Sequence, residues 1–328
     1  MLGLGGWLVI QQQLTLGQLV AAELIVTMVV GSFAKLGKHL EGWYDLMAAM
    51  NKLGLLIDLP LERAGGEWPA EAAPGRGARL AIRGLEYAYG DHDHHGPAQG
   101  HAHNVPDRAI RGLDLAVEPG ERLAIVGPGG SGKTTLADLI YGLRDPTRGR
   151  IEVDGLNARD LNLGHLREQV ALVKGVEVLE TSILENVRLG RNEILVSDVR
   201  DALEAVGLDR DLDRWPDGLH TPVAATGAPL SLGQVRRLML ARAIAGKPRL
   251  LVLDEALDGL DLVSRGHVLD RICDPSAPWT LVVITHDPEV ARRCDRVVSL
   301  DDGRLDRTMP QANGHAPRLE DWLKEARR

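Results

Sequence analysis

The chain has 328 residues, enough for one large domain and a smaller segment. Its 44% hydrophobic and 26% charged residues are typical of a packed globular protein. A net charge of −8 disfavours a nucleic-acid-binding surface, so we expect no nucleic-acid partner. The two cysteines, Cys273 and Cys294, provide neither a disulfide framework nor a CxxC metal site.

Residues 1–62 differ in character from the rest, and we expect them to be the C-terminal part of a transmembrane domain. Residues 14–36 are long and apolar enough for one spanning helix, which needs about 20 residues. Glu23 near the middle costs about 3 kcal/mol and roughly offsets the gain from the apolar residues around it. We therefore expect this helix to insert beside partner helices that shelter Glu23. An amphipathic helix packed on a soluble domain remains the alternative.

Composition changes twice along the rest of the chain. Residues 63–78 are rich in Gly, Pro and Ala, which predicts a linker. From residue 79 to 306, short apolar strands alternate with helices, which predicts an α/β domain. We expect residues 307–328 to form a C-terminal tail.

A glycine-rich loop follows the expected strand Arg122–Val126. It matches GxxxxGK[ST] at the start of a helix, the pattern of a phosphate-binding loop. Glycines let successive backbone amides turn toward an anion, and the helix dipole favours the same anion. We expect Lys133 to bind the β- and γ-phosphates of a nucleotide and Thr134 to bind Mg²⁺. The candidate nucleotide-binding residues here are Gly127, Pro128, Gly129, Gly130, Ser131, Gly132, Lys133, Thr134 and Thr135.

A second motif, Leu250–Asp254 followed by Glu255, reads as a buried central strand that ends in two carboxylates. Ligands of open α/β sheets bind at the carboxyl ends of the strands. We expect Asp254 to hold Mg²⁺ together with Thr134, and Glu255 to act as the general base or to orient the attacking water.

The segment Leu230-Ser-Leu-Gly-Gln234 resembles LSGGQ, the signature motif of the ATP-binding-cassette (ABC) family. Other marks of that family occur in the expected order, and the segments 182–187 and 215–221 resemble its exporter branch. The resemblance implies that Tyr89 stacks on adenine and that His286 contacts the γ-phosphate. It also implies that the signature residues bind the nucleotide of a second domain across a dimer and that Asp261 lies at this interface. The implied signature contacts are Ser231, Gly233 and Gln234.

The resemblance sets the expected fold and function. The fold is a P-loop NTPase domain of ABC type, with a mixed sheet core and a helical subdomain, preceded by a membrane-type helix. The cofactors are ATP and Mg²⁺, and the partners are a second ABC nucleotide-binding domain, in a homo- or heterodimer, and the transmembrane helices of an exporter. We expect the domain to face the cytoplasm at the inner membrane and to couple ATP-driven dimerisation and hydrolysis to transport. The chain reads as truncated relative to such an exporter.

Two positions depart from the family pattern. Lys174 stands where the family has a glutamine that touches Mg²⁺ and the attacking water, and a lysine is repelled by the metal but can contact phosphate. Gln169, five residues earlier in an expected strand, is a poor substitute. Leu232 replaces the first signature glycine. These departures predict a slow ATPase and leave two alternatives: a nucleotide-binding module with impaired turnover, or a soluble ABC ATPase unrelated to transport.

Histidines and aspartates cluster between residues 91 and 103. Such side chains can bind Zn²⁺, but the glycines and proline among them favour a mobile surface loop. We expect no dedicated metal site there and keep a metal sensor as the alternative.

Overall fold

The computed structural model describes residues 2–58, 62–63, 65–66, 76–90, 108–212 and 214–310. The histidine-rich segment 91–103, most of the expected linker and the tail beyond residue 310 lie outside these residues. The chain divides into two compact units, Met1–Arg63 and Ala64–Arg328.

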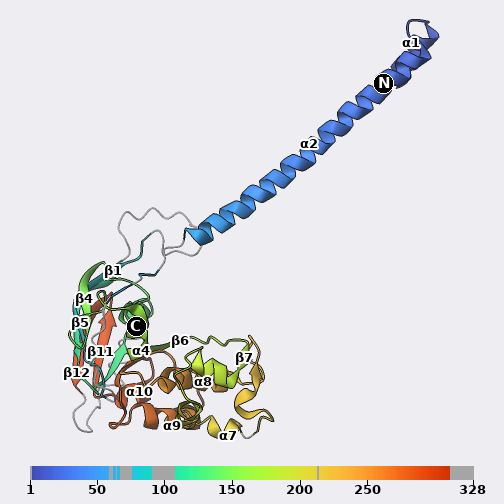
Figure 1. Cartoon of the computed structure of the whole chain (residues 1–328). Helices are drawn as coiled ribbons and strands as arrows, with labels where there is room; N and C mark the ends of the chain where they lie inside the picture. The colour runs from blue at the N-terminus through green and yellow to red at the C-terminus, as the bar shows by residue number, and fades with distance from the viewer. Residues whose placement is uncertain are drawn as a thin grey trace. The chain divides into compact units, whose positions relative to one another are not determined.

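The first unit consists of two helices, α1 (Leu2–Ile10) and α2 (Leu16–Ile57). Thr15 begins α2 with a capping box, in which its hydroxyl accepts from the Gln18 amide at 3.3 Å and its own amide donates to the Gln18 side chain at 2.9 Å. This reciprocal pair satisfies two amides that a helix N-terminus otherwise leaves without partners. Residues 16–36 of the apolar stretch and the more polar stretch after them form one continuous helix, drawn in blue in Figure 1.

Helix α2 is the one helix among the described residues that is long and apolar enough to cross a membrane. Its 42 residues extend for about 63 Å, roughly twice the hydrocarbon thickness of a bilayer. None of its most apolar 18-residue window is buried within the structure. Apolar side chains such as Leu24, Ile25 and Phe33 are more than 60% exposed, so this helix has its apolar surface available to lipid or to other helices.

The second unit is built on a six-stranded sheet in the order β12-β11-β3-β10-β9-β6. Strands β11, β3, β10, β9 and β6 run parallel, and β12 pairs antiparallel with β11 at one edge. The expected strands Arg122–Val126 and Leu250–Asp254 are β3 and β9, with the bounds read from the sequence. Strand β10 (Thr280–Ile284) lies between them, so the residues that follow β3 and β9 emerge at the same edge of the sheet.

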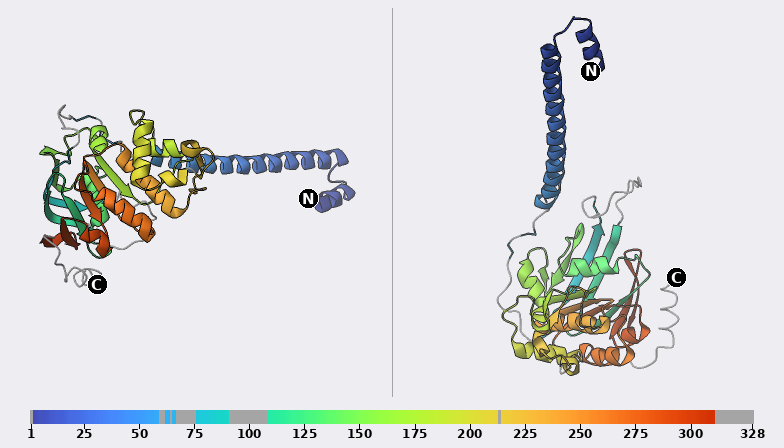
Figure 2. Two further views of the ribbon diagram at one scale, coloured as in Figure 1. Left: turned by 90° about the horizontal axis from the view of Figure 1, so that it is seen from below. Right: turned by 90° about the vertical axis from the view of Figure 1, so that its right-hand side faces the viewer.

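A four-stranded antiparallel sheet, β2-β1-β4-β5, lies beside the central sheet, and helices form the opposite part of the unit. Figure 1 shows α7, α8 and β7 on the side away from β1, β4 and β5. Helices α9 and α10, in orange, lie along one side of the central sheet in both views of Figure 2. The predicted fold class, a mixed sheet core with a helical subdomain and an N-terminal apolar helix, is confirmed. The other elements are β1 (Leu80–Ala88), β2 (Arg108–Val117), α3 (Lys133–Ile140), β4 (Arg148–Val153), β5 (Leu156–Asn157), α4 (Leu163–Gln169), β6 (Val170–Lys174), β7 (Thr181–Ser182), α5 (Ile183–Arg188), α6 (Val196–Ala205), α7 (Asp209–Leu212), η1 (Gly218–His220), β8 (Pro222–Val223), α8 (Leu232–Ala245), α9 (Leu262–Ile272), α10 (Pro288–Arg292), β11 (Arg296–Asp301) and β12 (Arg304–Pro310).

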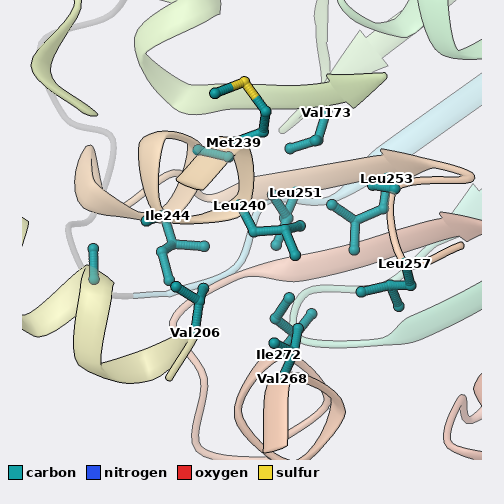
Figure 3. Packing of buried hydrophobic residues seen from close by; sticks show 14 of the residues in the cluster. Val173, Val206, Met239, Leu240, Ile244, Leu251, Leu253, Leu257, Val268 and Ile272 are labelled. Carbon is teal, nitrogen blue, oxygen red and sulfur yellow. The ribbon is translucent and has the colours of Figure 1, made fainter. Parts of the chain in front are cut away.

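The central sheet is buried on both faces, which explains why its strands read as continuous apolar runs. Along β9, Leu250 and Val252 face the cluster formed with α3 and the antiparallel sheet. Leu251 and Leu253 face the other cluster, which contains α8 and α9. Figure 3 shows this second cluster, where Leu240 of α8 lies against Leu251. Each fully buried leucine contributes about 1.5–3 kcal/mol, so the strands that carry the site are firmly held.

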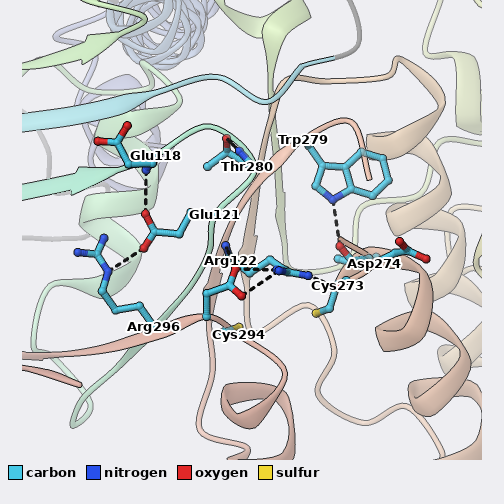
Figure 4. Close-up of polar contacts among 12 residues, drawn as sticks. Glu118, Glu121, Arg122, Cys273, Asp274, Trp279, Thr280, Cys294 and Arg296 are labelled. Carbon is cyan, nitrogen blue, oxygen red and sulfur yellow. Dashed lines mark hydrogen bonds and ion pairs between the residues drawn. The ribbon is translucent and has the colours of Figure 1, made fainter. Parts of the chain in front are cut away.

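Polar contacts hold the end of β3 opposite the glycine-rich loop (Figure 4). The Arg122 guanidinium donates to both carboxylate oxygens of Asp295, at 2.7 and 2.8 Å, and to the Cys273 carbonyl at 2.8 Å. The Asp295 carboxylate raises the pKa of Arg122 further. Only 17% of the Arg122 side chain is exposed, so these charge-assisted bonds are partly shielded from water and fix where β3 begins.

Replacing Arg122 with Leu should lower the stability of the second unit without changing its nucleotide affinity. The loss of three charge-assisted hydrogen bonds costs about 2 kcal/mol, or roughly 4–8 °C in melting temperature. Thermal unfolding of the full chain, followed by circular dichroism, measures this shift.

Arg79→Leu is the matched control, because the Arg79–Glu118 pair has side-chain exposures of 49% and 62%. Its removal should change stability by less than about 0.5 kcal/mol. Equal shifts for the two variants would contradict the importance of the Arg122 contacts.

Candidate functional site

The loop between β3 and α3 presents a row of backbone amides without partners. Among the described residues, no acceptor is recorded for the amides of Gly129, Gly130, Gly132, Lys133 and Thr134. Most backbone amides in proteins are paired, and an unpaired row costs free energy unless something outside the chain accepts from it. The row lies at the N-terminus of α3, where the helix dipole also favours negative charge. The arrangement suits phosphate oxygens.

Glycine is required at two positions of this loop. At Gly132 the backbone has φ of 99°, and an added Cβ would lie 2.4 Å from the Ala109 carbonyl oxygen. At Gly127 an added Cβ would lie 2.0 Å from the Leu300 carbonyl oxygen. These contacts with β2 and β11 hold the loop close to the sheet, so its shape depends on having no side chains there.

The Lys133 side chain lies within the same loop. Its ammonium donates to the carbonyls of Gly127 at 3.0 Å and Pro128 at 2.8 Å, and only 7% of the residue is exposed. Burial lowers the pKa of Lys133, while the charges of Glu255 and Asp254 act in the opposite direction. A buried cation whose partners are carbonyls and a hydroxyl gains strongly from an anion, so Lys133 adds to the preference of the amides for phosphate.

Asp254 ends β9 beside this loop and is only 7% exposed. Burial raises the pKa of its carboxyl, the Thr134 hydroxyl and the Lys174 ammonium lower it, and the charges of Glu255 and Asp138 raise it. The carboxylate therefore ionises more readily with a cation beside it. A hydroxyl and a carboxylate are oxygen ligands of the kind that Mg²⁺ prefers, and Thr134 and Asp254 suit that ion.

Glu255 and His286 lie together at the same edge of the sheet. Their side chains lie within hydrogen-bonding distance, with His286 Nε2 3.0 Å from Glu255 Oε1. Glu255 has φ of 53°, which is uncommon for a residue other than glycine, and its amide donates to the Ile284 carbonyl of β10 at 3.0 Å. The Glu255 side chain is 48% exposed. The structure thus brings together the two predicted catalytic residues, with the carboxylate open to a water molecule.

Tyr89 contacts the loop through its hydroxyl, which lies 2.7 Å from the Thr135 hydroxyl. The guanidinium carbon of Arg144 is 4.9 Å from the centroid of the Tyr89 ring, a cation–π distance. Tyr87 packs edge-on against Tyr89 at 5.2 Å between ring centroids. The predicted adenine-stacking residue is thus fixed beside the phosphate loop, and two neighbours orient its ring.

Lys174 ends β6 directly opposite Asp254 of β9. Its ammonium pairs with Asp138 of α3, at 2.5 Å between Nζ and Oδ1. The role of Asp138 is not evident from the sequence; the one signal is its place four residues after Thr134, on the same face of α3. The description of Gln169 as a strand residue is wrong: α4 ends at Gln169, and β6 begins at Val170.

The signature residues serve as helix caps within this chain. Ser231 is the N-cap of α8, its hydroxyl accepts from the Gln234 amide at 3.3 Å, and its amide donates to the Gln234 side chain at 2.8 Å. Asp261 likewise caps α9 by accepting from the amides of Val263 and Ser264. No hydrogen bond or ion pair among the described residues joins Ser231, Gly233 or Gln234 to the phosphate loop. One copy of the chain therefore holds two separate parts of the predicted site.

A groove of about 430 Å³ is separate from the phosphate loop, since none of residues 127–134 lines it. Its wall includes Lys174, Arg191 and Arg242. The two arginines donate to backbone carbonyls near the end of α5, as in the 2.7 Å bond from Arg242 to Asn186. Burial lowers the pKa of both. These cations hold the helical part together, and the chemistry favours the phosphate loop over this groove as the functional site.

Comparison with known proteins agrees with this geometry. The family model described as "ABC transporter" matches residues 110–258, which include the phosphate loop, the signature segment and Glu255. An ATP-dependent lipid A-core flippase of Chromobacterium violaceum is 33% identical over 88% of this chain and 48% of its own length. A multidrug efflux ATP-binding/permease protein of Mycobacterium bovis is 31% identical over 92% of this chain and 24% of its own length.

A solved structure is similar along almost the whole chain. It is described as a bacterial Atm1-family ABC exporter with ATP bound, and the match has a TM-score of 0.69 at 25% identity. It covers 98% of this chain and 53% of that one. The chain spans about half the length of the flippase and of this exporter.

Gly132→Ala should weaken nucleotide binding by about thirtyfold, because the strained backbone and the clash with Ala109 cost about 2 kcal/mol at the loop. Titration of the full chain with a fluorescent ATP analogue measures the affinity. Gly266→Ala in α9 is the control, since nothing lies within 4 Å of a Cβ added there. An unchanged affinity in Gly132→Ala would show that the loop does not need its observed shape to bind nucleotide.

Proposed function

We propose that this chain, whose residues 110–258 match the ABC transporter model, belongs to that family and is the nucleotide-binding part of an ABC exporter. In this role it binds MgATP and hydrolyses it slowly. The observation that carries the proposal is the row of amides of Gly129, Gly130, Gly132, Lys133 and Thr134, for which no acceptor is recorded among the described residues, together with the buried Lys133 ammonium. This cradle has the charge and donors that a triphosphate requires.

The residues around the cradle divide the work of binding. The amides and Lys133 hold the phosphates, and the Tyr89 ring packs on the adenine. Thr134 and Asp254 hold Mg²⁺, which supplies positive charge beside the phosphate oxygens when bound. The raised pKa of the Asp254 carboxyl supports this assignment, because a buried carboxylate needs a nearby cation to ionise readily.

The pair Glu255–His286 carries the hydrolytic step. Glu255 accepts a proton from a water molecule or orients it toward the γ-phosphate, and His286 holds the carboxylate in place at 3.0 Å. The 48% exposure of the Glu255 side chain leaves room for that water.

A second ABC nucleotide-binding domain completes the site. Within the part of the chain that the structure describes, no hydrogen bond or ion pair joins the signature residues Ser231, Gly233 and Gln234 to the phosphate loop, so they are available to the nucleotide of a partner domain. Leu232 is 60% exposed, and Leu262 and Val263 beside Asp261 are 75% and 84% exposed. Apolar side chains this exposed are buried favourably when two domains close on the nucleotide.

The first unit supports a location at a membrane. Helix α2 has the length and hydropathy of a spanning helix, and its apolar side chains are exposed for contact with further transmembrane helices. The curated relatives named above are a flippase and a multidrug efflux protein, and this likeness supports a role in transport. We assign the nucleotide-binding domain to the cytoplasmic face of the inner membrane, where closure around ATP drives movement of the membrane helices.

Slow turnover follows from two residues. The Lys174 ammonium lies near Asp254, where its charge opposes that of the metal, and Leu232 puts a bulky side chain within the signature segment. Both changes weaken contacts that matter most during hydrolysis, and neither removes the amide cradle that binds the nucleotide.

Two substitutions separate binding from hydrolysis. Lys133→Ala should weaken ATP affinity by at least about a hundredfold, because the phosphates lose a buried cation. Glu255→Gln should keep the affinity and lower hydrolysis by at least about a hundredfold, because the amide cannot accept the proton. Affinity is measured with a fluorescent ATP analogue and hydrolysis by phosphate release, using the full chain in lipid nanodiscs.

Lys247→Ala controls for the loss of a lysine, since Lys247 pairs with Asp198 in the helical part, at 2.6 Å. Unchanged ATP affinity in Lys133→Ala would refute nucleotide binding at this loop. Hydrolysis that persists in Glu255→Gln would refute the role of Glu255 in hydrolysis and would leave the proposal of nucleotide binding intact.

A further inference from the structure

The Lys174 ammonium lies near two carboxylates, Asp138 and the proposed metal ligand Asp254. Lys174 ends β6 opposite Asp254, and its Nζ lies 2.5 Å from Asp138 Oδ1. Asp138 follows Thr134 by four residues in α3, so both side chains lie on one face of that helix. The charges of Lys174 and Asp138 both act on Asp254. The hydroxyl, the two carboxylates and the ammonium therefore form one cluster.

Asp138 does not cancel the charge of Lys174 completely. Its other carboxylate oxygen, Oδ2, lies 3.7 Å from Arg144 Nε, and only 9% of the Asp138 side chain is exposed. One carboxylate thus serves two cations, and the three groups together carry one net positive charge. In a partly buried cluster this charge is poorly screened by solvent, and it acts on Asp254 and on any anion held by the loop.

We propose that the Lys174 ammonium, fixed by Asp138, is a built-in cation of the nucleotide site and makes nucleotide binding largely independent of Mg²⁺. The inference rests on the proposed function, since it concerns the same phosphate cradle. Two effects act in the same direction. The ammonium repels a divalent cation from Asp254, which weakens metal binding, and it attracts phosphate oxygens, which strengthens binding of the metal-free nucleotide.

Asp138 is a positioning residue in this arrangement. It holds a flexible side chain at the end of β6, which is otherwise free to turn toward solvent, since 39% of the Lys174 side chain is exposed. Through Arg144 the same carboxylate reaches the tyrosine pair beside the loop, because the Arg144 guanidinium lies 4.9 Å from the Tyr89 ring. One buried carboxylate thus orders the cation near the metal ligands and the aromatic ring at the base site.

The test compares nucleotide affinity with and without the metal. A non-hydrolysable ATP analogue is titrated calorimetrically into the full chain in nanodiscs, once with excess MgCl₂ and once with EDTA. The measured quantity is the Kd in EDTA divided by the Kd in MgCl₂. Lys174→Gln should raise this ratio by about tenfold over the wild type, and Lys174→Arg, which keeps the charge, should leave it unchanged within about twofold.

Asp138→Asn provides an independent signal in the same direction. It removes the carboxylate that holds the Lys174 ammonium, which can then turn toward solvent, so metal-free binding should become about threefold weaker. The melting temperature of Lys174→Gln shows whether that variant folds. If it does not fold, Asp138→Asn tests the proposal instead. Lys247→Gln is the matched control, because the Lys247–Asp198 pair has a similar length of 2.6 Å and lies in the helical part of the unit. It should leave the ratio unchanged.

The outcomes distinguish the two proposals. A ratio in Lys174→Gln within about threefold of the wild type, with the analogue bound tightly by both, overturns the built-in cation and leaves the proposed function intact. Metal-free binding in Asp138→Asn that is as tight as in the wild type, or tighter, overturns it as well. Failure of the wild type to bind the analogue in either buffer refutes the proposed function, and the inference with it.

Discussion

The structure depends on one electrostatic constraint, the need of a buried ammonium and a row of partnerless amides for an anion. Lys133 is 7% exposed and has only carbonyl and hydroxyl partners within the loop. Burying such a charged group lowers the stability of the folded state, and favourable packing elsewhere in the fold has to offset this free energy. The parallel sheet does so with leucines and valines buried on both faces, and Arg122 fixes the far end of β3. The strands that form the apolar core therefore also carry the polar site at their carboxyl ends.

Much of this site could be predicted from sequence because its chemistry is local in the chain. The glycines at 127 and 132 reveal a backbone that side chains would block, and the structure shows carbonyl oxygens where their Cβ atoms would stand. The apolar run Leu250–Asp254 has no alternation of polar residues, and the strand is buried on both faces. Each of these features lies within a few consecutive residues, so a single sequence is enough to predict it.

Other parts could not be predicted because they depend on contacts distant in sequence. Asp138 looks like an ordinary helix residue until β6 places Lys174 2.5 Å away, 36 positions later. Arg144 reaches both Asp138 and the Tyr89 ring only after the antiparallel sheet packs against α3. The helix boundary at Gln169 was also misread, because Val170 continues an apolar pattern that both a strand and a helix can carry. Spacing in the sequence gives no information about such pairings.

The signature segment shows how one hydroxyl can serve two purposes. Ser231 Oγ accepts from the Gln234 amide and so caps α8 within the isolated chain. A serine hydroxyl has two acceptor positions and one donor, and capping uses only an acceptor. The O–H therefore remains available to donate to an anion, at the N-terminus of a 14-residue helix whose dipole favours negative charge. Capping fixes the position of the hydroxyl within the chain, and the exposed Leu232 leaves this hydrogen bond intact, so a leucine at this position alters the shape of the segment and preserves the hydroxyl donor.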